Sequence, residues 1–183
     1  MNILSSLIFI DHQIATGVIN LRSDFMDHFF FLITRLGSWP IITGLFFVTA
    51  CLFWIYKKKQ LILPFLIVIA GAGIMTIIIK ALVDRSRPGA NLALYIEKLS
   101  SFPSAHAALI LAFIGFLAYC FWRFDFLLKT KIILSVVFGP LILLVGFSRI
   151  YLGVHFTSDI IAGYLTGLMW VLIGMYISRR RFS

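Results

Sequence analysis

Charged residues and cysteines are both scarce in this chain of 183 residues. Asp, Glu, Lys and Arg make up 13% of it, against about 25% in soluble domains, while 61% is apolar and the mean hydropathy is +1.04. So little charge excludes intrinsic disorder and leaves too few polar side chains to cover a globular core. Two cysteines are too few for a disulfide scaffold or a zinc site, and we expect Cys51 and Cys120 to be buried in apolar runs. The composition indicates a polytopic membrane protein.

Acidic residues are the scarcest charged type. Seven Asp and Glu stand against 16 Lys and Arg, which leaves a formal charge of +9. In a soluble protein this excess would suggest a nucleic-acid partner, but here the cations flank long apolar runs and no separate basic domain exists. Membrane topology and lipid headgroups explain them better, so we expect a lipid bilayer and no nucleic acid as partner.

Long charge-free runs predict where the chain crosses the bilayer, since a helical span needs about 20 residues. The first span along the chain is predicted at Asn2–Leu21, and it is imperfect because it carries a polar Asp-His-Gln triplet at its centre. The segment after it, Asp24–Arg35, is predicted to lie along the membrane surface. The expected fold is an all-α membrane bundle of about six transmembrane helices, occupying residues 1–183 as one domain. The five clearer spans are Leu36–Tyr56, Gln60–Ile79, Leu99–Trp122, Ile132–Ser148 and Ile160–Ser178.

The distribution of Lys and Arg predicts the orientation of this bundle. With six spans, nine basic residues fall on one side and seven on the other. The richer side is predicted to be cytoplasmic, which places both termini in the cytoplasm. Seven cations then remain on the exoplasmic face, where the rule disfavours them.

Three short polar segments fall at span ends on that exoplasmic face. Residues 80–88 end the third span, residues 102–106 open the fourth, and residues 148–159 join the fifth to the sixth. In an up-and-down bundle all three meet at one membrane face. Ionisable side chains at membrane depth are unfavourable and therefore indicate function, so we predict the active site where these segments converge.

The cations of these segments suit a phosphate dianion. Lys80, Arg87 and Arg149 supply fixed positive charge, and guanidinium groups bind phosphate oxygens in pairs. Pro103 is well placed in the first turn of a helix, which would leave nearby amides without intrahelical acceptors and form an anion site. The residues that offer these amides, and in the first case a hydroxyl, are Ser104, Ala105 and His106.

The two histidines of these segments differ in their neighbours. Asp159 follows His155 by four positions, close enough to accept the imidazole proton and leave the other nitrogen free for nucleophilic attack. His106 has no carboxylate near it in sequence and is better suited to protonate a leaving oxygen. No chemistry is assigned to His12, His28, Asp11, Asp24 or Asp27.

These segments resemble the three-part signature of the type 2 phosphatidic acid phosphatase family of integral membrane lipid phosphatases. The first part, Lys followed after six residues by Arg-Pro, is present at 80–88. The second, Pro-Ser-Gly-His, is present at 103–106 with Ala105 in place of glycine. The third has the form Ser-Arg, five residues, His, three residues, Asp, and matches Ser148, Arg149, His155 and Asp159.

The resemblance implies that His155 attacks phosphorus to form a phosphohistidine, that Asp159 orients it, and that His106 protonates the leaving group. It implies a metal-independent hydrolase without cofactors, in a bacterial inner or plasma membrane, with an outward-facing site. The implied substrates are phosphatidylglycerophosphate, phosphatidic acid, undecaprenyl pyrophosphate or lipid A, entering from the bilayer. The phosphoryl oxygens would be held by Lys80, Arg87, Ser104, Arg149 and the amide of Ala105.

Other hypotheses use the same residues. A small anion transporter or channel would line its path with them, and it predicts ionisable groups at several depths or an inverted repeat. A metal-dependent hydrolase would use His106, His155 and Asp159, but three nearby cations would repel a divalent metal. A vanadium-dependent peroxidase has a related oxyanion site, but the predicted membrane spans argue against this class of enzyme. A lone lysine at a helix end also commonly extends to the membrane interface without further function.

Overall fold

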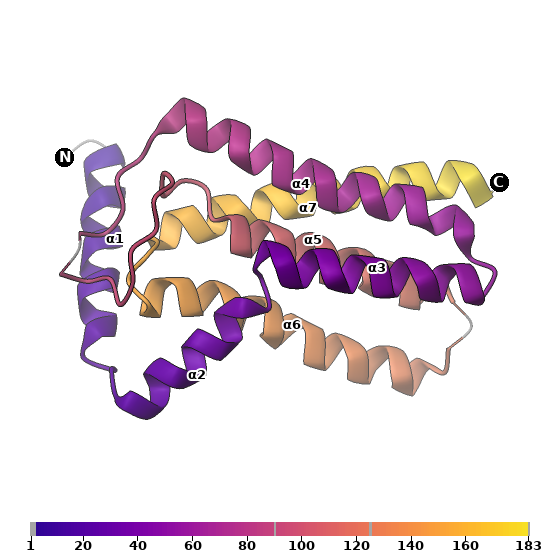
Figure 1. Cartoon of the computed structure of the whole chain (residues 1–183), viewed down its shortest axis with the longest axis horizontal. Helices are drawn as coiled ribbons and strands as arrows, with labels where there is room; N and C mark the ends of the chain where they lie inside the picture. Colours follow the sequence, from indigo (N-terminus) through magenta and orange to yellow (C-terminus); the bar gives the residue numbers. More distant parts are fainter. Residues whose placement is uncertain (1–2, 90, 125, 183) are drawn as a thin grey trace.

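The computed structural model describes residues 3–89, 91–124 and 126–182, and it confirms an all-helical membrane bundle. The helices α3 to α7 run side by side along the long axis, whereas α1 lies across one end of them (Figure 1). In the described residues the chain forms seven α-helices and one short 3-10 helix, which are α1 (Ile3–Ile19), α2 (Asp24–Arg35), α3 (Trp39–Ile55), η1 (Lys59–Leu61), α4 (Ile62–Val83), α5 (Ala105–Arg123), α6 (Leu128–Tyr151) and α7 (Thr157–Phe182).

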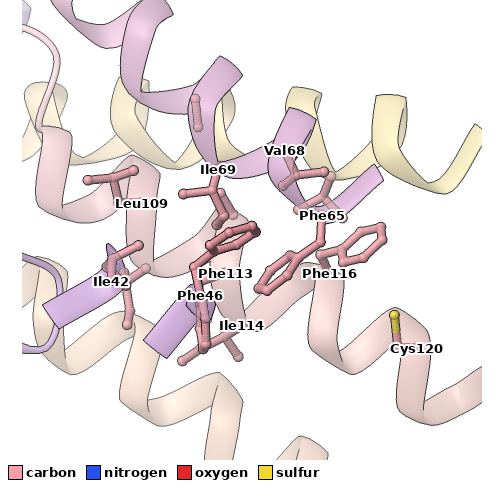
Figure 2. Packing of buried hydrophobic residues seen from close by; sticks show 14 of the residues in the cluster. Ile42, Phe46, Phe65, Val68, Ile69, Leu109, Phe113, Ile114, Phe116 and Cys120 are labelled. Atoms are coloured by element: carbon pink, nitrogen blue, oxygen red, sulfur yellow. The ribbon is translucent and has the colours of Figure 1, made fainter. Parts of the chain in front are cut away.

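Aromatic packing fills the centre of the bundle, where α3, α4 and α5 meet (Figure 2). The ring of Phe65 is fully buried and stacks on Phe116, with ring centroids 5.5 Å apart and an interplanar angle of 12°. Phe46 from α3 and Phe113 from α5 approach the same ring at 5.2 and 5.4 Å. Large apolar side chains also cover the outside of the helices, as expected of a surface that faces lipid.

Small residues bring α7 directly against α5. A methyl group on Gly163 would lie 2.5 Å from the carbonyl oxygen of Ser104, and one on Gly167 would lie 2.5 Å from that of Ala108. Only glycine allows the two backbones to approach this closely. The approach holds the start of α7, which carries Asp159, beside the start of α5.

Local signals place the helix ends that carry the three polar segments. The residue after α4, Asp84, has φ 41° and ψ 48°, a left-handed conformation that ends the helix. Ser104 has an extended backbone, and its hydroxyl accepts a 3.5 Å hydrogen bond from the amide of Ala107, so it caps α5. Between α6 and α7, Gly153 has φ 72°, which glycine adopts without strain.

The part of the chain that the structure describes contains fewer clear spans than the expected six or so, and the difference lies in the first segment. Helices α4 to α7 are each long and apolar enough to cross a membrane, and α2 with α3, a pair bent by 49°, makes a fifth span if the pair is taken as one. Helix α1 lies across the bundle instead (Figure 1). The reason is its polar centre, because Asp11 is 4% exposed and is bound by Arg85 and Ser158 of the bundle.

The prediction that both termini share one side is wrong for the same reason. The beginning of α1 and the end of α7 lie at opposite ends of the bundle (Figure 1). Helix α2 has the predicted bounds, but it is more than a surface segment, since Phe30 and Thr34 are buried and the ring of Phe30 lies 5.5 Å from that of Phe147 in α6.

Two smaller expectations also differ from the structure. The fourth predicted span begins at Ala105 and not at Leu99, because the preceding residues belong to the loop between α4 and α5. Cys120 is buried as predicted, but Cys51 is exposed. Helix α3 buries the face that carries Ile42, Phe46 and Phe53, and Cys51 lies off that face.

Candidate active site

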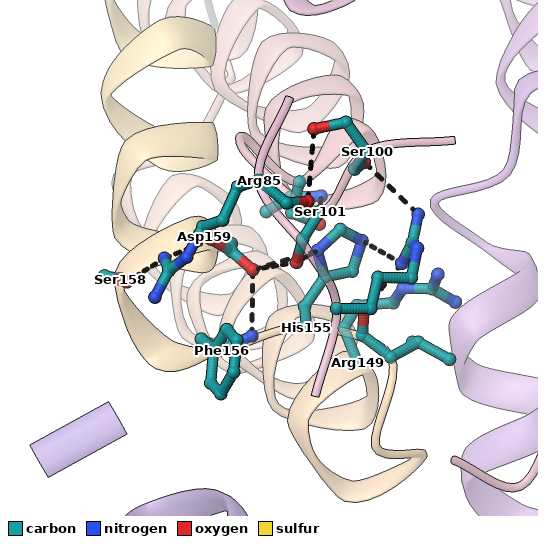
Figure 3. Close-up of polar contacts among 12 residues, drawn as sticks. Arg85, Ser100, Ser101, Arg149, His155, Phe156, Ser158 and Asp159 are labelled. Atoms are coloured by element: carbon teal, nitrogen blue, oxygen red, sulfur yellow. Dashed lines mark hydrogen bonds and ion pairs between the residues drawn. The ribbon is translucent and has the colours of Figure 1, made fainter. Parts of the chain in front are cut away.

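The three predicted polar segments meet at the end of the bundle that α1 covers. The end of α4, the start of α5 and the connection between α6 and α7 converge there, and the loop between α4 and α5 folds over them (Figures 1 and 3). They line a half-open cavity of about 240 Å³. Its lining residues are Trp39, Lys80, Arg87, Glu97, Lys98, Leu99, Ala105, His106 and His155.

His155 and Asp159 form the predicted pair. The Nδ1 atom of His155 lies 3.4 Å from Oδ2 of Asp159, and the two residues are 2% and 0% exposed. The same carboxylate oxygen accepts hydrogen bonds from the Ser101 hydroxyl and, at 2.9 Å, from the amide of Phe156 (Figure 3). A carboxylate on Nδ1 favours the tautomer whose Nε2 carries a lone pair. Nε2 lies 3.4 Å from the Arg87 guanidinium at the cavity.

Burial keeps His155 neutral. The pKa of this imidazole is lowered from 6.5 to about 4, because loss of solvation and the nearby guanidinium groups of Arg149 and Arg87 outweigh the hydrogen bond to Asp159, which raises it. An imidazole with this pKa is uncharged at neutral pH. It is therefore available as a nucleophile without first losing a proton.

Two of the predicted cations line the cavity and also hold its covering loop. Arg87 donates to the carbonyl oxygens of Val154 at 2.5 Å and Leu99 at 2.8 Å. Lys80 donates from Nζ to the carbonyl oxygens of Ser100 at 2.5 Å and Ser101 at 3.2 Å. These bonds fix the loop residues that bring Ser101 to the carboxylate of the pair.

Arg149, the third predicted cation, lies behind the cavity and is fully buried. Its guanidinium donates to Thr34 of α2 at 2.8 Å and to the Tyr95 hydroxyl, and it pairs with Glu97. Its Nε has no hydrogen-bond partner among the residues that the structure describes. Glu97 therefore stands between this cation and the cavity.

Glu97 occupies the position of an anion in the site. One carboxylate oxygen pairs with Arg149 and the other lies 2.7 Å from Arg87. Burial raises the pKa of this carboxyl, but the two guanidinium groups outweigh burial and bring it from 4.5 to about 2. The carboxylate is ionised, and it already binds the charges that the sequence assigns to phosphate.

Of the three predicted residues at the start of α5, two line the cavity and one does not. Ala105 and His106 line the cavity. Ser104 is fully buried and does not line it; its hydroxyl caps the helix, and its amide donates to the carbonyl oxygen of Asp159 at 3.0 Å. The prediction that the Ser104 amide is free is therefore wrong, because α7 packs close enough to supply an acceptor.

Four residues at the site carry no assignment from the sequence. Glu97 is the one glutamate of the chain, and its place before the motif at 103–106 is a signal that could have singled it out. Arg85 and Ser101 stand inside or beside the recognised motifs without belonging to them, and both bind Asp159. Asp11 could not be found in this way, because its partner Arg85 is 74 positions away.

A neutral histidine held by a carboxylate beside clustered cations provides the groups that phosphoryl transfer requires. Residues 61–183 match the model of the PAP2 superfamily, and the chain belongs to this superfamily. Together with the apolar helices, the match makes the protein a multi-pass membrane phosphatase.

Individual relatives support this assignment. Over 160 residues the chain is 29% identical to phosphatidylglycerophosphatase B of Bacillus subtilis (strain 168), covering 87% of this chain and 78% of that protein. The crystal structure of a transmembrane PAP2-type phosphatidylglycerolphosphate phosphatase from Bacillus subtilis has a TM-score of 0.88 and 27% identity, covering 98% of this chain and 88% of that one. LpxE of Aquifex aeolicus has a TM-score of 0.72 and 26% identity, with 90% and 93% covered.

Proposed function

We propose that this protein hydrolyses a phosphate ester or pyrophosphate of a membrane lipid through a phosphohistidine at His155, without a metal ion. The observation that carries the proposal is the environment of His155. Its Nδ1 is held by Asp159, and its Nε2 lies at a cavity lined by Lys80 and Arg87. This arrangement favours a nucleophile aimed at a phosphorus atom among fixed positive charges.

The reaction proceeds in two displacements. In the first, the Nε2 lone pair of His155 forms a bond to phosphorus while the bond from phosphorus to the lipid oxygen breaks, and His106 gives that oxygen its proton. In the second, water attacks the phosphohistidine, His106 takes the proton of the water, and phosphate leaves as Nε2 regains its electron pair. Lys80 and Arg87 stabilise the charge on the phosphoryl oxygens in both steps.

The phosphoryl group must displace Glu97 from at least one guanidinium to use all three cations. Arg149 reaches the cavity only when the Glu97 carboxylate moves, since that carboxylate bridges it to Arg87. Ala105 and His106 at the start of α5 line the same cavity, and amides in the first turn of a helix point outward as anion donors.

The size of the cavity favours a phosphoryl headgroup with its tails left in the bilayer. About 240 Å³ accommodates a phosphate and its ester oxygen but no glycerolipid. The names of the relatives make phosphatidylglycerophosphate the first lipid to test. Phosphatidic acid, undecaprenyl pyrophosphate and lipid A, which the motif resemblance implies, are tested after it.

The proposed location is a bacterial inner or plasma membrane with the site on the exoplasmic side. The basic residues at the other end of the bundle include Lys57 to Lys59, Arg123 and Lys131, and such an excess marks the cytoplasmic side. At the site end, by contrast, Arg85, Arg87 and Arg149 are paired with carboxylates.

The test is phosphate release from each candidate lipid by purified protein in detergent micelles, with His155→Ala as the control. We expect release from at least one lipid phosphate by the wild type and none by the variant. Equal rates for both proteins, or no release from any of these lipids, would contradict the proposal.

A further inference from the structure

Helix α1 delivers a buried carboxylate to the catalytic end of the bundle. Asp11, at the centre of this helix, is 4% exposed. Its Oδ1 accepts a 3.0 Å hydrogen bond from the amide of Ser158, its Oδ2 accepts one from the Ser158 hydroxyl, and Oδ2 lies 2.9 Å from the Arg85 guanidinium. Ser158 directly precedes Asp159, so α1 is attached to the residue beside the catalytic carboxylate.

Arg85 connects this carboxylate to that of the catalytic pair. One of its terminal nitrogens pairs with Asp11, and the other lies 2.6 Å from Oδ1 of Asp159 (Figure 3 shows Arg85 beside Ser158 and Asp159). Its guanidinium also lies over the ring of Phe156, 4.5 Å from the centroid. The ring of His12, next to Asp11, contacts the same ring at 4.9 Å.

The two oxygens of Asp159 therefore have different partners. Oδ1 binds Arg85, whereas Oδ2 faces His155, the Ser101 hydroxyl and the amide of Phe156. By Coulomb's law, the negative charge of Asp11 offsets part of the attraction that Arg85 exerts on Asp159. The orientation and charge of Asp159 toward His155 thus depend on whether Asp11 takes its share of Arg85.

We propose that Asp11 is a positioning residue for catalysis, which acts through Arg85 to hold Asp159 in the orientation and charge that align His155. The proposal rests on the proposed function of His155 as nucleophile. It assigns α1 a part in the chemistry, although none of the α1 side chains that the structure describes lines the cavity.

The chain offers variants that separate charge from docking. Asp11→Asn keeps an oxygen for the Ser158 amide and removes the charge shared with Arg85. Asp11→Glu keeps the charge. Asp24→Asn is the matched control, because Asp24 is an exposed carboxylate in the first turn of α2.

The assay measures kcat and KM on dioctanoyl phosphatidic acid and on p-nitrophenyl phosphate, normalised to monodisperse protein. For Asp11→Asn we expect a fall in kcat of about tenfold, as for the loss of one charged hydrogen bond, with KM changed less than twofold. Asp11→Glu should recover most of kcat, and Asp24→Asn should match the wild type.

A double variant tests whether the effect passes through Arg85. If it does, Asp11→Asn causes no further loss of kcat once Arg85→Gln is present, since coupled residues are not additive. If Asp11 only docks α1, the same tenfold loss appears in both backgrounds and the proposal is overturned.

The same assays distinguish failure of the proposed function from failure of the role of Asp11. If the wild type and His155→Ala are equally inactive on both substrates, the proposed function fails. If the wild type is active, His155→Ala is inactive and Asp11→Asn retains wild-type kcat, only the role of Asp11 is overturned.

Discussion

Glu97 is the residue whose removal has the clearest consequence for ligand binding. Its carboxylate pairs with Arg149 and Arg87 in the position where we propose the phosphoryl group binds. Substituting Glu97→Gln removes this internal anion while keeping a side chain of nearly the same size. We expect the variant to bind inorganic phosphate more tightly than the wild type.

The structure sets the scale of this gain. The Glu97 pKa lies at about 2 and not 4.5, which corresponds to about 3 kcal/mol of net attraction at 1.36 kcal/mol per pKa unit. This attraction is the upper limit of the binding free energy that phosphate gains when the Glu97 charge is removed. Gln still offers one oxygen to a guanidinium, so we expect phosphate to gain about half of this free energy. A gain of about 1.4 kcal/mol lowers the inhibition constant about tenfold.

The assay is inhibition of p-nitrophenyl phosphate hydrolysis by inorganic phosphate at fixed ionic strength. Asp84→Asn is the matched control, because it removes one exposed carboxylate at the end of α4 and Asn tolerates its left-handed backbone. We expect no more than a twofold change there. Weaker phosphate binding by Glu97→Gln would refute the reasoning, since it would mean that Glu97 arranges Arg87 and Arg149 for the ligand and does not compete with it.

Three further predictions follow from the proposed roles. His106→Ala should lose about 10²–10⁴-fold on a lipid phosphate, whose alkoxide needs a proton to leave, and much less on p-nitrophenyl phosphate; equal losses on both would contradict a general acid. Phosphatase activity should survive thorough EDTA treatment, because side chains supply the positive charge; complete loss restored by one divalent ion would favour a metal-dependent hydrolase. Reporters placed after Lys58 and at the C-terminus should report cytoplasm and an insertion at Gly89 the outside; the reverse would overturn the orientation.

The sequence predicted the convergence of the three polar segments because each begins or ends at a helix end. Charge-free runs locate those ends, and an up-and-down bundle brings alternate ends together. Lys80, Arg87, His106 and His155 accordingly line one cavity. Spacing was also sufficient for the contact between His155 and Asp159, because His155 lies just before α7 and Asp159 lies in its first turn.

Contacts between distant segments could not be predicted from one sequence. Asp11 is a polar interruption in an apolar run, which suggests an imperfect span until its partner 74 positions away is known. Ser104 was predicted to offer a free amide, but the glycines of α7 bring the Asp159 carbonyl within 3.0 Å of it. Glu97 gained its role from two arginines on different segments.

Direct detection of a phosphohistidine tests the central claim most sharply. His106→Ala mixed with a ³²P-labelled aryl phosphate should accumulate the intermediate, because the aryl group leaves unaided while hydrolysis of the phosphohistidine lacks its base. We predict an acid-labile, base-stable label that peptide mapping under alkaline conditions places on His155, and that is absent from the His106→Ala/His155→Ala double variant. Release of aryl alcohol without any label on His155, or a label of equal size in the double variant, would contradict the account.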